Sequence, residues 1–149
     1  MILFIIINVV IVAADIITKN IALTSFSGND VELIKNVLYF SYVENRGAAF
    51  GILSNARYIF ISVTVITIIG IIIYLIKRKP GFLPLVAGLA MVSGGGIGNL
   101  IDRLGKEYVI DFIDFRLIGF PVFNVADIFV TVGAVLIFIS VLFFEDKIK

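Results

Sequence analysis

The stretch that decides the fold is YIFISVTVITIIGIIIYLI, residues 58–76, which contains no charged residue and is followed at once by Lys77-Arg78-Lys79. A helix needs about 20 mostly apolar residues to cross the hydrocarbon core of a bilayer. A dense basic cluster beside such a run is typical of the cytoplasmic end of the span. We therefore predict a transmembrane helix over residues 58–76 whose last residues face the cytoplasm.

Three more segments have a similar character, over residues 2–23, 82–101 and 126–144. The chain has 149 residues, of which 60% are hydrophobic and 15% charged, whereas soluble domains are about 45–50% apolar and about 25% charged. We predict an all-α integral membrane protein with four transmembrane helices in a single domain, residues 1–149. Cleavage of the first segment as a signal peptide after Val12-Ala13-Ala14 is the alternative, but no Lys or Arg precedes that run.

Two connecting regions, residues 24–55 and 102–123, are too long for simple turns. The first contains β-branched and aromatic residues in partly alternating order, which predicts a small antiparallel β-sheet after the first helix. Lys147 and Lys149 follow the last span on the same side as the basic loop at residues 77–79. We therefore expect both termini in the cytoplasm and both connecting regions outside it, although the outer regions also carry bases, mixed there with acids.

The chain contains neither cysteine nor histidine, which excludes thiol nucleophiles, disulfides, histidine triads and the usual zinc ligands. We expect neither a metal nor a cofactor. The net charge of +1 and the lack of a basic stripe argue against nucleic acid as a partner. Any catalysis must then use carboxylate, hydroxyl, lysine or amide groups.

Ionisable residues inside the predicted spans are candidates for function. Asp15 and Lys19 stand four apart and so share one helix face, where a structural ion pair is the simplest interpretation. The stretch GGGIGNLIDR, residues 94–103, places Asn99, Asp102 and Arg103 on one side of a helix end. Close helix packing explains the glycines, and an anchored helix end at the membrane interface is the alternative for the three polar residues.

Two further carboxylates, Asp111 and Asp127, lie among apolar residues in separate stretches of chain. Asn124 and Asp127 are three apart at the start of the fourth span, where an N-terminal cap would account for them. If Asp111 folds back against Asp127, one of the two acids would keep a proton. Such a pair could activate water and protonate a peptide carbonyl.

Together these motifs resemble one family, the prolipoprotein signal peptidases or signal peptidase II, which are bacterial membrane aspartyl endopeptidases. The resemblance rests on five blocks in the family's order, at residues 15–19, 44–50, 94–103, 109–112 and 123–127. The departures are Ile16, where Gln is common, and Ile128, where Ser is frequent.

The resemblance implies a role for each of nine residues. The catalytic pair would be Asp111 and Asp127. The residues expected to position substrate are Asn45, Asn99, Arg103 and Asn124, and those expected to support the site are Asp15, Lys19 and Asp102.

The resemblance also implies an activity and a location. The substrate would be a prolipoprotein with diacylglycerol on its lipobox cysteine, cleaved just before that cysteine to release the signal peptide. We expect a monomer in the bacterial inner membrane among its lipids, with its active site toward the outer face, and inhibition by globomycin. Residues 48–53 are expected to close over the substrate, and the sheet to lie on the membrane as a cradle.

The sequence leaves three other interpretations of the function open. Buried carboxylates and a glycine-interrupted helix also mark small ion- or proton-coupled carriers. A serine protease could use Lys19 with Ser25 or Ser41. A noncatalytic membrane scaffold would tolerate Asp127→Asn.

Overall fold

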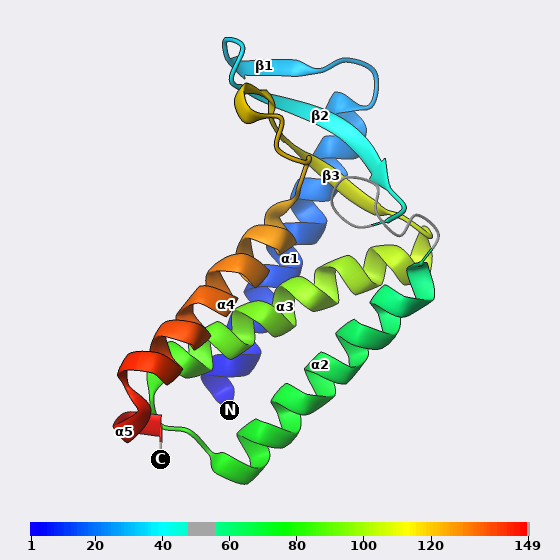
Figure 1. Cartoon of the computed structure of the whole chain (residues 1–149). Coiled ribbons are helices and arrows are strands. Elements are labelled where there is room, and N and C mark those ends of the chain that lie inside the picture. The colour runs from blue at the N-terminus through cyan, green and yellow to red at the C-terminus, as the bar shows by residue number, and fades with distance from the viewer. Residues whose placement is uncertain (48–55, 149) are drawn as a thin grey trace.

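The structure is a computed structural model and describes residues 1–47 and 56–148. Figure 1 shows long helices that extend away from a small sheet at one end of the molecule. In chain order the elements are α1 (Ile2–Phe26), β1 (Val31–Ile34), β2 (Leu38–Asn45), α2 (Arg57–Arg78), α3 (Leu83–Gly105), β3 (Val109–Phe115), the 3-10 helix η2 (Arg116–Ile118), α4 (Val125–Phe143) and α5 (Glu145–Ile148). The predicted fold class, four apolar helices with an antiparallel sheet after the first, is confirmed. The expected closing segment at 48–53 lies outside the described residues.

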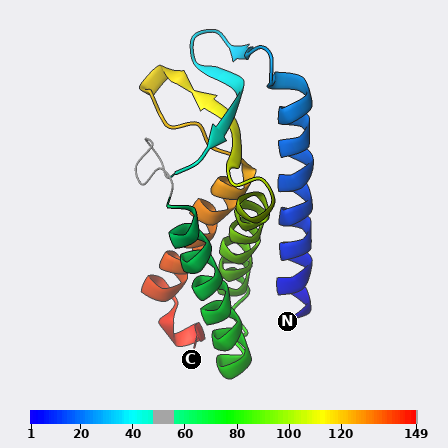
Figure 2. The ribbon, with the colours of Figure 1, turned by 90° about the vertical axis from the view of Figure 1, so that its right-hand side faces the viewer.

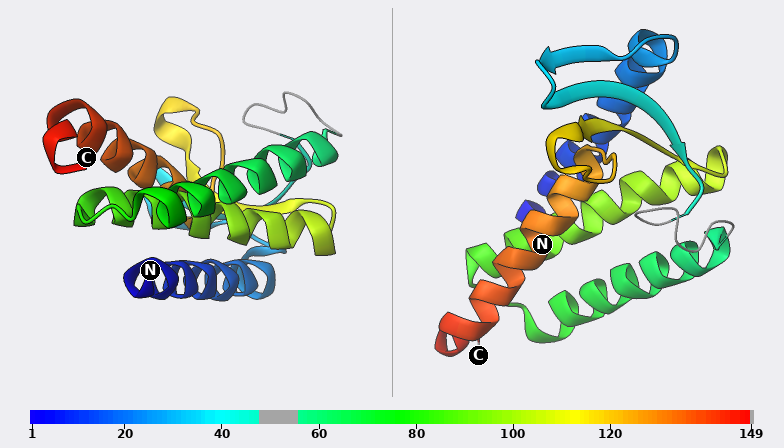
Figure 3. Two further views of the ribbon diagram at one scale, coloured as in Figure 1. Left: turned by 90° about the horizontal axis from the view of Figure 1, so that it is seen from below. Right: turned by 45° about the horizontal axis from the view of Figure 1, so that its top comes forward.

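The helices α1, α2, α3 and α4 are each long and apolar enough to cross a membrane. Helix α3 is the central one: 56% of its most apolar window is buried, against 11% for α2. Figure 2 shows α1 on one side of α3, with α2 and α4 on the other, and the view from below in Figure 3 agrees. Most of the surface of α2 is therefore left to face lipid.

Close packing of α3 against α4 depends on glycines in both helices. A Cβ atom added to Gly88 would lie 2.9 Å from the carbonyl oxygen of Gly133, and one added to Gly133 would lie 2.7 Å from that of Gly88. A Cβ atom added to Gly95 would lie closer still to the carbonyl oxygen of Ala126, at the start of α4. The packing role predicted for the glycines of residues 94–98 is confirmed at Gly95, and Gly88 and Gly133 add a second close contact that the sequence pattern did not indicate.

The sheet is antiparallel in the order β1-β2-β3. In its central pairing, Val43 is opposite Asp111 and Asn45 is opposite Val109. The sequence indicates a short extended or irregular stretch at residues 108–115, and the structure shows that Val109–Phe115 within it form the third strand. Its inner side packs on the end of α1, where Ile110, Phe112 and Ala22 form a buried cluster.

A short closed loop joins β3 to α4. Ile113 donates its backbone N–H to the carbonyl oxygen of Phe123 at 2.8 Å, and Phe123 donates its own to the carbonyl oxygen of Ile113 at 3.1 Å. The chain therefore returns to the sheet immediately before α4 begins. Both termini lie at the opposite end of the molecule (Figure 1).

Candidate active site

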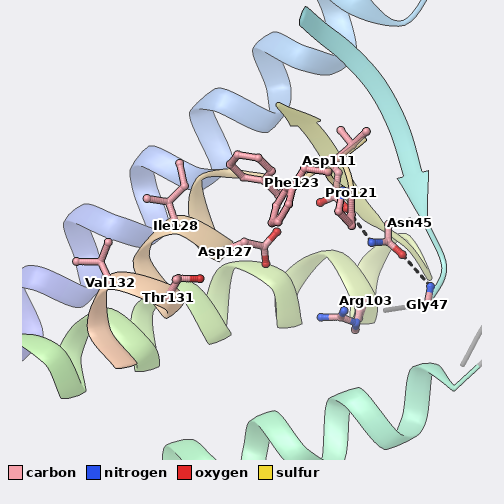
Figure 4. A pocket seen from close by; sticks show the side chains of 12 residues that line it. Asn45, Gly47, Arg103, Asp111, Pro121, Phe123, Asp127, Ile128, Thr131 and Val132 are labelled. Atoms are coloured by element: carbon pink, nitrogen blue, oxygen red, sulfur yellow. Dashed lines mark hydrogen bonds between the residues drawn. The ribbon is translucent and has the colours of Figure 1, made fainter. Parts of the chain in front are cut away.

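Asp111 and Asp127 line the same cavity, where the sheet meets the helices. Figure 4 shows Asp111 on β3 and Asp127 on α4, both pointing into it. Its volume is about 450 Å³. The residues that line the cavity are Asn45, Gly47, Arg103, Asp111, Phe120, Pro121, Val122, Phe123, Asp127, Ile128, Thr131 and Val132.

The start of α4 fixes the position of Asp127. The side chain of Asn124 accepts a hydrogen bond from the backbone N–H of Asp127 at 3.0 Å, and Asp127 Oδ2 accepts one from the backbone N–H of Asn124 at 3.1 Å. This reciprocal pair is a capping box. The cap predicted for Asn124 is therefore present, and it leaves the second oxygen of Asp127 for other contacts.

Side-chain amides connect the two carboxylates. Asn124 Nδ2 donates to Asp111 Oδ1 at 2.6 Å and lies 3.1 Å from Asn99 Oδ1. Asn99 Nδ2 in turn donates to Asp127 Oδ1 at 2.8 Å. On the other side, Asn45 Nδ2 donates to Asp111 Oδ2 at 2.8 Å. The three asparagines predicted to position substrate thus also hold the carboxylates.

The environment of Asp111 favours its protonated form. The side chain is buried in β3, and this burial is the main cause that raises the pKa of Asp111 to about 7. The nearby charge of Asp127 raises the pKa further, while the hydrogen bonds from Asn45 and Asn124 oppose the shift. A carboxyl group with this pKa can hold a proton near neutral pH and release it during a reaction.

Lys19 supports the site from α1 through three contacts. Its Nζ lies 2.7 Å from Asp15 Oδ2 and 3.0 Å from Asp102 Oδ2. The predicted ion pair is present, and Asp102 extends it to three charges. Lys19 Nζ also donates to Asn99 Oδ1 at 2.9 Å. Because the oxygen end of the Asn99 amide is held by Lys19, the nitrogen end faces Asp127.

The cluster around Lys19 also ties the helices and the sheet together. Asp15 Oδ1 accepts the backbone N–H of Ala126, in the first turn of α4, at 3.1 Å. Asp102 Oδ2 accepts the backbone N–H of Ile110, beside Asp111 in β3, at 3.3 Å. The same two acids therefore position the backbone next to each of the two cavity carboxylates.

Arg103 lies on α3 beside the cavity. Its guanidinium lies over the ring of Phe60 in α2, with its carbon 4.9 Å from the ring centroid. In the described part of the chain no carboxylate forms an ion pair with Arg103, since Asp102 binds Lys19 and Lys106 instead. Its hydrogen-bond donors are therefore available to a ligand in the cavity.

Sequence reasoning missed the apolar wall of the cavity, which includes Phe120, Val122 and Val132, because such side chains carry no chemical signal of their own. The serine alternative finds no support. Ser41 Oγ contacts Arg116 and Asp114, and within residues 1–47 and 56–148 no hydrogen bond joins Lys19 to Ser41 or Ser25. The described residues also contain no group of three or more acidic side chains placed to hold a metal ion.

The sequence and the fold both have close counterparts among known proteins. The family model for signal peptidase (SPase) II matches residues 7–143. The chain is 41% identical to the lipoprotein signal peptidase of Clostridioides difficile (strain 630), over 97% of this chain and 98% of that protein. It is 40% identical to the lipoprotein signal peptidase of Lactobacillus johnsonii, over 97% and 95%. A solved bacterial membrane enzyme superimposes with a TM-score of 0.87 at 36% identity, over 98% of this chain and 91% of that one.

Proposed function

The chain belongs to the signal peptidase II family, and from this premise we propose that it is an aspartic endopeptidase with Asp111 and Asp127 as its catalytic pair. As a signal peptidase II it removes the signal peptide from diacylglyceryl-modified prolipoproteins, cleaving just before the lipidated cysteine. The family match does not favour the carrier alternative.

One observation carries the proposal: two carboxyl groups from separate elements line one cavity and are bridged by Asn124 and Asn99. They lie in unlike surroundings. Asp111 is 2% exposed and has a raised pKa of about 7, whereas Asp127 accepts hydrogen bonds from Asn99 and from the backbone N–H of Asn124. We assign Asp111 as the protonated acid and Asp127 as the base.

The reaction then proceeds in two steps. Asp127 takes a proton from a water molecule as the water oxygen attacks the scissile carbonyl carbon, and Asp111 gives its proton to the carbonyl oxygen. In the second step the C–N bond of the diol intermediate breaks. Asp127 passes its proton to the leaving nitrogen while one hydroxyl of the diol returns a proton to Asp111, so both acids regain their starting states.

Asn45 and Arg103 are the proposed contacts for the peptide backbone. Both line the cavity beside the acids, and the guanidinium of Arg103 has donors available for a substrate carbonyl. Such contacts would hold the scissile bond in place, and correct orientation supplies a large part of many enzymatic rate gains. The closing role expected for residues 48–53 stays a prediction.

We propose that the cavity faces the outer side of the bacterial inner membrane. The basic end of α2 and both termini lie at the end opposite the sheet (Figure 1), and basic loops favour the cytoplasm. A substrate anchored by its signal helix and acyl chains would then present its scissile bond near the outer interface. A monomeric state and inhibition by globomycin are further parts of the proposal.

The test uses the purified full-length protein in detergent with a peptide that carries a diacylglyceryl-modified lipobox cysteine. Asp111→Asn and Asp127→Asn should each lower kcat by about 10²–10⁴-fold, because each removes one partner of the proton transfers. The matched control is Asp114→Asn, on the same strand as Asp111, whose carboxylate contacts Arg116 and Ser41 instead of the cavity.

A thermal melt of each variant shows that it is folded. Full activity in a folded Asp111→Asn or Asp127→Asn protein would rule out the aspartic mechanism. A parent that cleaves no peptide, together with an Asp127→Asn protein that folds as well as the parent, would instead favour the scaffold alternative.

A further inference from the structure

The inner part of the cavity contains one polar group that the mechanism does not use. Figure 4 shows Ile128, Thr131 and Val132 along α4, beyond Asp127. Among the described residues that line the cavity, the other polar side chains belong to the catalytic and substrate-positioning groups around Asp127. Thr131 therefore supplies the single hydroxyl of an otherwise apolar compartment.

The Thr131 hydroxyl differs from those of Thr18 in α1 and Thr67 in α2. Thr18 donates to the carbonyl oxygen of Ala14 at 2.8 Å, and Thr67 donates to that of Val63 at 2.8 Å. Within the part of the chain that the structure describes, Thr131 makes no such bond and is exposed. Its hydroxyl instead points into the cavity on the side of Asp127 (Figure 4).

A hydrogen-bond donor in apolar surroundings is unfavourable unless a ligand pairs with it. Two kinds of acceptor enter with the substrate: peptide carbonyls of the signal helix and ester carbonyls of the diacylglyceryl group. Within the signal helix the peptide carbonyls are bonded to the helix's own backbone, and Asn45 and Arg103 are already the proposed contacts for the backbone at the scissile bond. The ester carbonyls come with no donor of their own, because a diacylglyceryl group contains only acceptors.

We propose that Thr131 donates a hydrogen bond to an ester carbonyl of the substrate's diacylglyceryl group and so helps the enzyme to recognise the lipid. The inference rests on the proposed function, because it needs the lipidated cysteine beside the scissile bond. Thr131 follows Asp127 by one helical turn, about 6 Å along α4. The esters lie a few bonds beyond the cysteine sulfur, so they can reach this depth when the scissile bond is at Asp127.

The walls around Thr131 suit the acyl chains that continue from these esters. Ile128 and Val132 flank it on α4, and Phe123 and Pro121 line the same cavity. These apolar side chains would bury the first methylene groups of an acyl chain. Such burial favours binding but does not fix the direction in which the acyl chain runs. The hydroxyl would fix the position of the glycerol ester within that apolar wall.

The experiment compares two lipobox peptides with equal chain lengths, one with two ester-linked acyl chains and one with two ether-linked alkyl chains. Both are given to the purified full-length parent and to Thr131→Val, Thr131→Ser and Thr67→Val. Thr131→Val removes the hydroxyl at nearly constant volume, and Thr131→Ser keeps it. Thr67→Val makes the same change on α2, where the hydroxyl is already bonded to the backbone.

The parent should prefer the ester peptide by about five-fold in kcat/KM, as expected for one neutral hydrogen bond. Thr131→Val should lose that preference, whereas Thr131→Ser and Thr67→Val should keep it. Equal cleavage of both peptides by the parent, or an unchanged preference in Thr131→Val, would overturn the inference.

Two further results separate the possible failures. An equal loss on both peptides in Thr131→Val would mean that the hydroxyl binds a peptide carbonyl, which also overturns the inference. If Thr131→Val melts early, Thr131→Ala provides the same comparison. Failure of the parent to cleave either peptide would instead contradict the proposed function.

Discussion

The two ends of the helix bundle are built on different principles. At the end away from the sheet, the core is a cluster of apolar side chains that includes Phe4, Leu75 and Leu89. At the sheet end, the small apolar cluster of Ile110 and Phe112 is accompanied by a buried polar network, joined by hydrogen bonds, that includes Lys19, Asp15 and Asn124. Apolar packing is non-directional and accepts substitutes of similar volume, whereas each buried polar group needs its own partner. Sequence freedom should therefore differ sharply between the two ends.

The largest expected effect comes from Lys19→Met. This change leaves Asp15 and Asp102 buried beside each other without the one buried cation that pairs with both. Removing one partner of a buried ion pair typically costs about 3–5 kcal/mol of stability. Unfolding of the parent and the variant in the same detergent measures the difference, and activity should also fall because Asn99 loses the contact that orients its amide.

Lys106→Met is the matched control for that change. Lys106 Nζ also pairs with Asp102, at 3.2 Å, but its side chain is 36% exposed. An ion pair in contact with water contributes about 0–1 kcal/mol. Equal losses of stability in the two variants would show that burial of the charges is not what distinguishes the sheet end.

A second, smaller effect follows from the raised pKa of Asp111, about 7 in the folded protein against 3.8 for the unperturbed group. Between these pH values Asp111 is protonated in the folded state and charged in the unfolded state. Its contribution to the free energy of unfolding is therefore fully present below about pH 4 and is lost as the pH rises toward 7. The loss is at most about 1.4 kcal/mol per pH unit. Asp111→Asn cannot titrate. The Tm of the parent should therefore fall relative to that of Asp111→Asn between pH 5 and pH 7, and a constant difference would contradict the raised pKa.

The smallest effect is expected at the opposite end of the bundle. Leu89→Met alters a buried residue of the apolar cluster while nearly conserving its volume. Such exchanges usually cost less than about 1.5 kcal/mol, and the cleavage rate should be unchanged. A loss as large as that of Lys19→Met, measured by the same unfolding experiment, would contradict the proposed contrast between the two ends.

The same contrast explains what the sequence could predict. The four spans follow from apolar runs, which depend on composition alone, and the Asp15–Lys19 pair follows from helical spacing. The Lys19–Asn99 contact and the pairing of β2 with β3 join residues far apart in the chain. Neither has a local pattern, because both result from how the elements pack together.

The candidate site shows a similar division. Asp111 and Asp127 could be chosen from the sequence because carboxylates among apolar residues are unusual, and the family blocks contain both. The unpaired hydroxyl of Thr131 carries no such mark, since most helical threonines bond to their own backbone. Thr131 is distinguished only in the folded structure, where its hydroxyl points into the cavity.

The backbone bridge between Ile113 and Phe123 has a consequence for the membranes in which this protein can work. It closes the loop that joins Asp111 to Asp127. Each acid lies only a few residues along the chain from the bridge, so the bridge fixes the distance between the two acids locally. A thicker or thinner bilayer is accommodated largely by helix tilt. We expect such tilting to carry the two acids along together, so that changes in lipid composition alter how deep the scissile bond must lie but leave the pair itself assembled.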